Sequence, residues 1–277
     1  MRNPAPSRHL PNTERLSVLA ATILLAYALT RFVNLPGWVL AARPLGIQVT
    51  IRINVQTIIP LLVAGLMAAG TSWLLSDHPA LYGQTRRGPG PEHWLLPAVV
   101  AWVIGIPLEQ MSVGFQWVLG LAVGGILLVL ILTAEYIAMD AEDLRLPLAE
   151  AGLTAVSFAA YLILAIALRA AETRLYLILP ALALTASVIS LRTWHLRLGG
   201  EWAWIESALV MVIVGQVAAA LHYWPLPALS YGLAVLGPAY AMTNLVTGVA
   251  QGATFRQALA GPLVMLAISW GAAWWIR

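Results

Sequence analysis

The sequence predicts an all-α integral membrane protein, a polytopic bundle of about nine transmembrane helices within one membrane domain, residues 1–277. Of the 277 residues, 60% are hydrophobic and 10% are charged, whereas soluble domains have about 45–50% and about 25%. So few charges cannot cover the surface of a water-soluble globule. In addition, apolar runs recur that approach the roughly 20 residues a helix needs to cross a hydrocarbon core of about 30 Å.

The apolar runs define the expected spans and the segments between them. The spans are expected at residues 16–33, 55–75, 94–108, 113–137, 148–170, 175–193, 203–222, 228–250 and 257–276. Residues 1–15 are expected to form a cytoplasmic tail and residues 76–93 a polar loop. Ala26-Tyr27-Ala28 resembles a signal-peptide cleavage site, but a retained first helix is the preferred interpretation for a multi-pass chain.

Proline and tryptophan support the edges of these spans. Pro97, Pro180 and Pro227 each stand in a Leu-Pro-Ala triplet. They predict helix starts, because the first helical turn has no internal acceptor for an N–H. Tryptophans near the expected span ends predict interfacial belts, and they are Trp38, Trp73, Trp94, Trp194, Trp202, Trp204, Trp224, Trp274 and Trp275.

Arginine placement predicts the orientation. All fifteen basic residues are arginine. Cytoplasmic segments of membrane proteins are rich in basic residues, and with the N-terminus inside the cell they would hold most of these arginines. The cytoplasmic arginines would be Arg2, Arg8, Arg15, Arg86, Arg87, Arg145, Arg192, Arg197 and Arg256. The expected location is the inner cell membrane with the N-terminus in the cytoplasm. The arginines are scattered rather than gathered in one patch, so no nucleic-acid partner is expected.

Residues 47–56 alternate strictly between apolar and polar side chains, and many of the apolar ones are β-branched. A period of two predicts an extended segment, near residues 46–56. Exposed strand backbone is costly in hydrocarbon, so the segment should lie at the membrane interface or against the helices. The preferred interpretation is an interfacial lead-in to the second span, and the alternative is a binding platform.

The densest acidic cluster straddles the end of the fourth expected span and comprises Glu135, Asp140, Glu142, Asp143 and Glu150. Clustered carboxylates can hold Mg²⁺, which in turn binds a diphosphate. The stretch from Glu135 to Asp143 resembles an aspartate-rich motif of the nine-helix intramembrane prenyltransferases. It departs from that motif in lacking the Asn-Asp opening, in following the fourth span rather than the second, and in having no second DxxxD motif. The resemblance implies a magnesium site at Glu135, Asp140 and Asp143, and the competing interpretation is solvated loop acids.

The eighth expected span carries a stripe of small and polar residues. Gly237, Tyr240, Asn244, Thr247 and Gln251 recur at spacings of three and four, which places them on one helix face. Such a face should not meet lipid. It predicts either close helix packing, which is the favoured interpretation, or the lining of a cavity for a polar solute or a lipid headgroup.

Two further polar residues and a second small-residue face lie inside spans. Glu206 and Gln216 of the seventh span are candidates to share the cavity with the stripe. Gln116, Gly120 and Gly124, each four residues apart, predict a packing face on the fourth span.

No established catalytic motif is present. The sequence has no Gly-x-Ser-x-Gly, His-Glu-x-x-His or phosphate-loop pattern, and it contains no cysteine. We therefore expect no catalytic residue, cofactor or metal ligand. The preferred hypothesis is a carrier of a small or lipidic solute, or a membrane subunit that binds other membrane proteins. The alternative is a magnesium-dependent enzyme acting on a lipid or prenyl diphosphate.

Overall fold

The computed structural model describes residues 10–30, 38–42, 49–53, 55–81, 89–140 and 142–276. These residues form nine α-helices, two β-strands and one 3₁₀ turn. In chain order they are α1 (Thr13–Leu29), β1 (Trp38–Ala42), β2 (Val49–Ile53), α2 (Val55–Leu75), η2 (Pro79–Leu81), α3 (Pro91–Gln110), α4 (Phe115–Ile137), α5 (Leu146–Ala170), α6 (Leu175–Arg197), α7 (Trp204–His222), α8 (Ala228–Ala250) and α9 (Phe255–Trp275).

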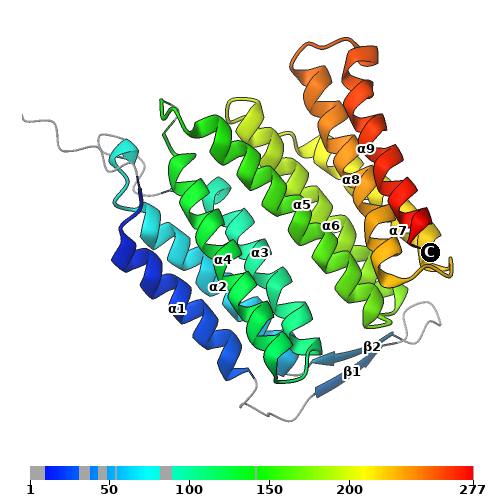
Figure 1. Ribbon diagram of the computed structural model, residues 1–277, viewed down its shortest axis with the longest axis horizontal. Coiled ribbons are helices and arrows are strands. Elements are labelled where there is room, and N and C mark those ends of the chain that lie inside the picture. The colour runs from blue at the N-terminus through cyan, green and yellow to red at the C-terminus, as the bar shows by residue number, and fades with distance from the viewer. Residues whose placement is uncertain are drawn as a thin grey trace, which may run out of the picture.

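The helices form one bundle in which consecutive helices run antiparallel (Figure 1). Helices α1 to α4 occupy one side, α5 and α6 the middle, and α8 and α9 the opposite edge. The start of α1 meets the end of α2, where Arg15 Nη1 donates to the Trp73 carbonyl at 3.1 Å. We call the end where α1 begins the N-side, and the end where α1 finishes and the strands lie the hairpin side.

Eight of the described helices, α2 to α9, are long and apolar enough to cross a membrane. Helix α1 has 17 residues, which is about 25 Å of helix and a little short of the hydrocarbon thickness. Together they confirm the predicted polytopic bundle of about nine helices. The lipid bilayer therefore surrounds the protein.

The predicted helix starts at Pro97 and Pro180 are wrong. Both prolines lie inside helices, Pro97 in α3 and Pro180 in α6. Helix α3 begins six residues earlier, with Pro91 in the first-turn position where a missing N–H costs nothing. Pro227 does stand at a helix start, as the N-cap of α8. Interior prolines are tolerated here because neighbouring groups in a membrane bundle can satisfy the freed carbonyls.

The predicted extended segment is confirmed for residues 49–53, which form β2. It pairs antiparallel with β1, with Trp38 opposite Ile53 and Ala42 opposite Val49. Strand β1 was not predicted, and its backbone supplies the hydrogen-bond partners that an isolated β2 would lack. Helix α2 already begins at Val55, so residues 55–56 are helical, and the remaining predicted residues, 46–48 and 54, lie outside the described residues.

Helix α6 extends four residues beyond its predicted end at residue 193, to Arg197. Arg192, which the arginine count assigned to the cytoplasmic side, is buried within this helix. Trp194 was predicted to join the interfacial belt, and this is wrong. Its side chain is fully buried, and its Nε1 donates to the Thr243 carbonyl of α8 at 3.0 Å.

Candidate functional site

Three ionisable side chains from three helices meet inside the N-side half of the bundle. Glu135 of α4 accepts from Arg192 of α6, with Nη2 to Oε2 at 2.5 Å and Nε to Oε1 at 3.3 Å. The Nδ1 of His93, in the first turn of α3, lies 3.0 Å from the same Oε2. We call these three residues the charged cluster.

The protonation of the charged cluster follows from what each group can donate. A carboxylate bound to a guanidinium only accepts hydrogen bonds. A hydrogen bond from His93 to Glu135 therefore uses the tautomer with the proton on Nδ1. Arg192 Nη2 lies 3.5 Å from the same Nδ1. In a neutral imidazole this leaves the Nε2 lone pair of His93 facing away from Glu135.

Burial makes this pairing obligatory. The side chain of Glu135 is fully buried and that of Arg192 is 2% exposed. Removing two charges from water costs several kcal/mol per ion, which only their mutual attraction and further hydrogen bonds offset. An unpaired charge in the same place would be strongly destabilising. The charged cluster therefore fixes the end of α4 against α6.

Polar contacts continue from α6 to α8 at the same depth. Ser190 Oγ lies 2.7 Å from Thr243 Oγ1, and Arg197 Nη1 donates to Asn244 Oδ1 at 2.9 Å. Hydrogen bonds at this level thus link α3, α4, α6 and α8. The N-side half of the bundle is held together by directional bonds as well as by packing.

His78, between α2 and α3, packs on the end of α4. Its ring meets the Tyr136 ring edge-on, with centroids 4.4 Å apart, and its Nδ1 accepts from the Ala80 N–H at 3.1 Å. Burial lowers the pKa of His78 below its ordinary value of 6.5, and the nearby His93 lowers it further. Asp140 and Asp143 partly oppose this pKa shift. The contact with Ala80 requires the neutral ring, because a protonated Nδ1 cannot accept.

Helix α4 is packed very differently at its two ends. Its buried residues begin at Gly124 and continue to Tyr136, whereas none of residues 115–123 is buried. Leu119 and Val123 are about half exposed, at 53% and 48%. The charged cluster thus anchors the second half of α4, and the first half stands away from α5.

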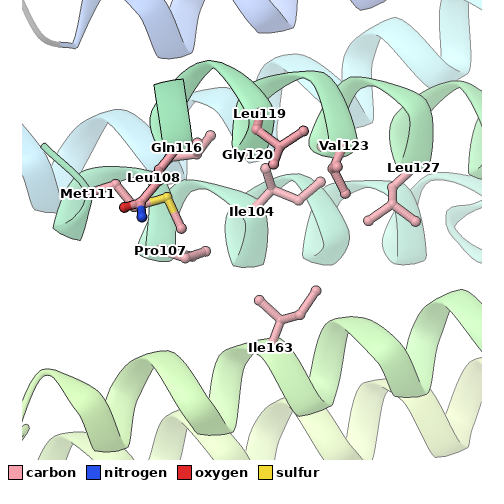
Figure 2. Close-up of a pocket in the computed structure, with 11 residues that line it drawn as sticks. Ile104, Pro107, Leu108, Met111, Gln116, Leu119, Gly120, Val123, Leu127 and Ile163 are labelled. Carbon is pink, nitrogen blue, oxygen red and sulfur yellow. The ribbon is translucent and has the colours of Figure 1, made fainter. Parts of the chain in front are cut away.

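An apolar groove of about 580 Å³ lies between the first half of α4 and helices α3 and α5 (Figure 2). Its walls are Ile104, Pro107, Leu108 and Met111 of α3, Gln116, Leu119, Gly120, Val123, Gly124 and Leu127 of α4, and Ile163 of α5. In Figure 2, Ile163 faces the side chains of α3 and α4 from across the groove. These residues place the groove in the hairpin-side half of the bundle. All of them except Met111, the C-cap of α3, lie inside candidate membrane spans.

Glycine shapes this groove. A methyl group at Gly124 would lie 2.7 Å from Ile104 Cγ2, so α3 and α4 touch there, whereas one at Gly120 would lie 3.2 Å from Leu108 Cδ2. On the face predicted from Gln116, Gly120 and Gly124, both glycines thus lie close to side chains of α3. Gln116, at the start of the helix, is exposed.

The three carboxylates of the predicted magnesium site have separate contacts. Glu135 binds Arg192, while Asp140 Oδ1 accepts from the Glu142 N–H at 3.0 Å and Asp143 Oδ1 from the Arg145 N–H at 2.8 Å. The two aspartates thus stabilise the turn between α4 and α5. Within the described residues, no group of three or more acidic, histidine or cysteine side chains could hold a metal ion.

The predicted stripe on α8 makes packing contacts along most of its length. A Cβ at Gly237 would collide with Ser269 of α9, the Tyr240 ring meets Phe158 of α5 at 5.1 Å, and Asn244 binds Arg197. Thr247 is buried and donates to a carbonyl of its own helix.

The other predicted cavity residues lie elsewhere. Gln251 caps α8 and is exposed, and Glu206 and Gln216 lie on the exposed face of α7. The structure therefore does not bring the seventh-span residues together with the stripe.

His93 and Arg192 were not predicted as site residues. The sequence does contain a signal for these site residues. Arg192 follows the apolar run of α6, and Glu135 is the one charged residue in the apolar run of α4. An ionisable residue at membrane depth is a functional candidate by default. Their partnership, across 57 positions, has no local sequence pattern.

The chain belongs to a family described as "Protein of unknown function (DUF5656)", whose model matches residues 35–276. The match covers the hairpin and helices α2 to α9. No curated protein and no solved structure matches the chain. The family assigns no activity, so a function has to be argued from the charged cluster and the groove.

Glu135→Gln should destabilise the bundle by about 3–5 kcal/mol, because Arg192 would remain buried without a counter-charge. Combining it with Arg192→Met should recover much of that loss. The measurement is the free energy of unfolding in a mixed-detergent titration. Asp77→Asn is the control, since the Arg15–Asp77 pair is partly exposed and should contribute at most about 1 kcal/mol. Equal costs for Glu135→Gln and Asp77→Asn would contradict this assignment.

His78 should make the protein less stable in mild acid. Because its folded pKa lies below 6.5, the unfolded chain binds the proton first as pH falls, so the contribution of His78 is complete above 6.5 and is lost below it. Thermal unfolding at about pH 7.5 and about pH 5.5 should show this loss. His78→Asn should shrink the difference, since its Oδ1 can accept from Ala80 without titrating. An unchanged difference would show that other groups cause it.

Proposed function

We propose that this member of the family is a carrier of a lipidic solute, whose hydrocarbon chain lies in the groove between α3, α4 and α5. The observation that supports this proposal is the groove itself, an apolar space of about 580 Å³ at membrane depth. Ligand sites in proteins commonly measure about 300–1,000 Å³. A groove of that size therefore has room for a substantial part of a lipid.

The position of the groove favours a lipid over a water-soluble solute. Its walls are apolar except at Gln116, so they offer water and polar solutes few hydrogen bonds. The exposed Leu119 and Val123 stand at its opening, on the surface that the bilayer surrounds. A lipid chain can therefore enter sideways from the bilayer without crossing a polar barrier.

The anchoring of α4 explains how such a groove persists. Helices in a membrane close gaps by packing, since dispersion contacts are the main attraction between them. Here the charged cluster fixes the second half of α4, and Gly124 sets its contact with Ile104. Closing the groove would require α4 to pivot about these contacts.

Val123→Trp should fill the groove and lower photolabelling of α3, α4 and α5 by a tail-diazirine phosphatidylcholine by about tenfold. It should also slow protein-dependent movement of tail-labelled lipid between the leaflets of proteoliposomes. Both readouts use the full chain, with labelled peptides mapped by mass spectrometry.

Val118→Trp is the matched control, because Val118 is a similarly exposed valine of α4 outside the groove lining. Leu119→Trp offers a second way to fill the groove should Val123→Trp not fold. Labelling and lipid movement that stay at the wild-type level in both groove variants would overturn the proposal. If a helix of another protein cross-links to the groove in native membranes, this chain is instead a membrane subunit of a larger assembly.

A further inference from the structure

We infer that the groove selects an uncharged lipid, whose chain fills the apolar walls and whose small polar head hydrogen-bonds the side chain of Gln116. This inference rests on the proposed function and adds the chemical class of the ligand. It follows from the length of the groove, the uncharged residues of its lining and the hydrogen-bonding state of Gln116.

The groove is about as long as one leaflet is thick. Along α4 its lining runs from Gln116 to Leu127, which is about 16 Å at 1.5 Å of rise per residue. Half of a hydrocarbon core of about 30 Å is about 15 Å. A lipid chain that fills the groove therefore places its head near Gln116, in the first turn of α4.

The lining carries no charge. Among its eleven residues, Gln116 has the only side chain that forms strong hydrogen bonds. A phosphate in the groove would find no counter-charge among these eleven residues, and burying a charge without one is costly. An alcohol, ketone or ester head loses much less on the same transfer and can bond to an amide.

The guanidinium of Arg169, near the end of α5, is bound to other parts of the chain. Arg169 donates to the carbonyls of His222 at 2.9 Å and Trp224 at 3.0 Å, and its guanidinium lies over the Tyr231 ring. These contacts hold it at the α7–α8 connection. Arg169 therefore stabilises that turn and does not line the groove.

Gln116 is the available amide at this end of the groove. Gln110 of α3 donates its Nε2 to the Ala167 carbonyl of α5 at 3.2 Å, which links two walls of the groove. The side chain of Gln116 is exposed and makes no hydrogen bond to the described part of the chain. An amide offers both a donor and an acceptor to a neutral head.

A matched pair of probes tests the inference: a diazirine-tagged long-chain prenol and the phosphate monoester of the same prenol, each in phosphatidylcholine nanodiscs with the full chain. The prenol should label the groove peptides at least about tenfold more than its phosphate. Gln116→Leu should lower prenol labelling about fivefold. Gln116→Arg should raise labelling by the phosphate. Gln216→Leu, at an exposed glutamine of α7, should change neither.

The outcomes separate the inference from the proposed function. Equal labelling by both probes, with no effect of Gln116→Leu but a loss in Val123→Trp, would overturn head selection and leave the lipid groove standing. Preferential labelling by the phosphate would overturn head selection as well. Groove labelling absent for every lipid, and unchanged in Val123→Trp, would overturn the proposed function and this inference with it.

Discussion

A carboxylate that is fully buried in a membrane bundle needs a cation beside it, and this requirement determines how the helices of this protein meet. Glu135 of α4 satisfies it with Arg192 of α6 and with the imidazole of His93. Each partner comes from a different helix. If Arg192 moved away, two buried charges would be left unpaired, and if His93 moved away, Glu135 would lose a hydrogen bond. The contacts of α6 with α8 at the same depth extend this constraint across the bundle.

The consequence appears at the other end of α4. Because the charged cluster and Gly124 fix the second half of this helix, its first half is free to diverge from α5. The space that results is apolar and lies within the spans, so the bilayer is the natural source of its occupant. The polar half of the bundle holds the helices together, and the apolar half contains the groove that we propose as the binding site.

The features that could be predicted from the sequence are those that depend on neighbouring residues in the chain. Hydropathy and span length are local, and they predicted the number of helices and most of their limits. The alternating residues of β2 predicted its extended backbone, but its partner β1 required knowledge of pairing. Trp194 was misplaced because a tryptophan near a span end looks the same whether it faces lipid or the Thr243 carbonyl. The charged cluster depends on contacts between residues far apart in the chain, which no local pattern in a single sequence records.

A density map of the protein in lipid nanodiscs, obtained by electron cryomicroscopy, tests the central claim most directly. The account predicts Arg192 in direct contact with Glu135, together with elongated, chain-like density between α3, α4 and α5 that reaches from Leu127 to Gln116. A map in which the first half of α4 packs directly on α5, or in which Arg192 points away from Glu135, would contradict it.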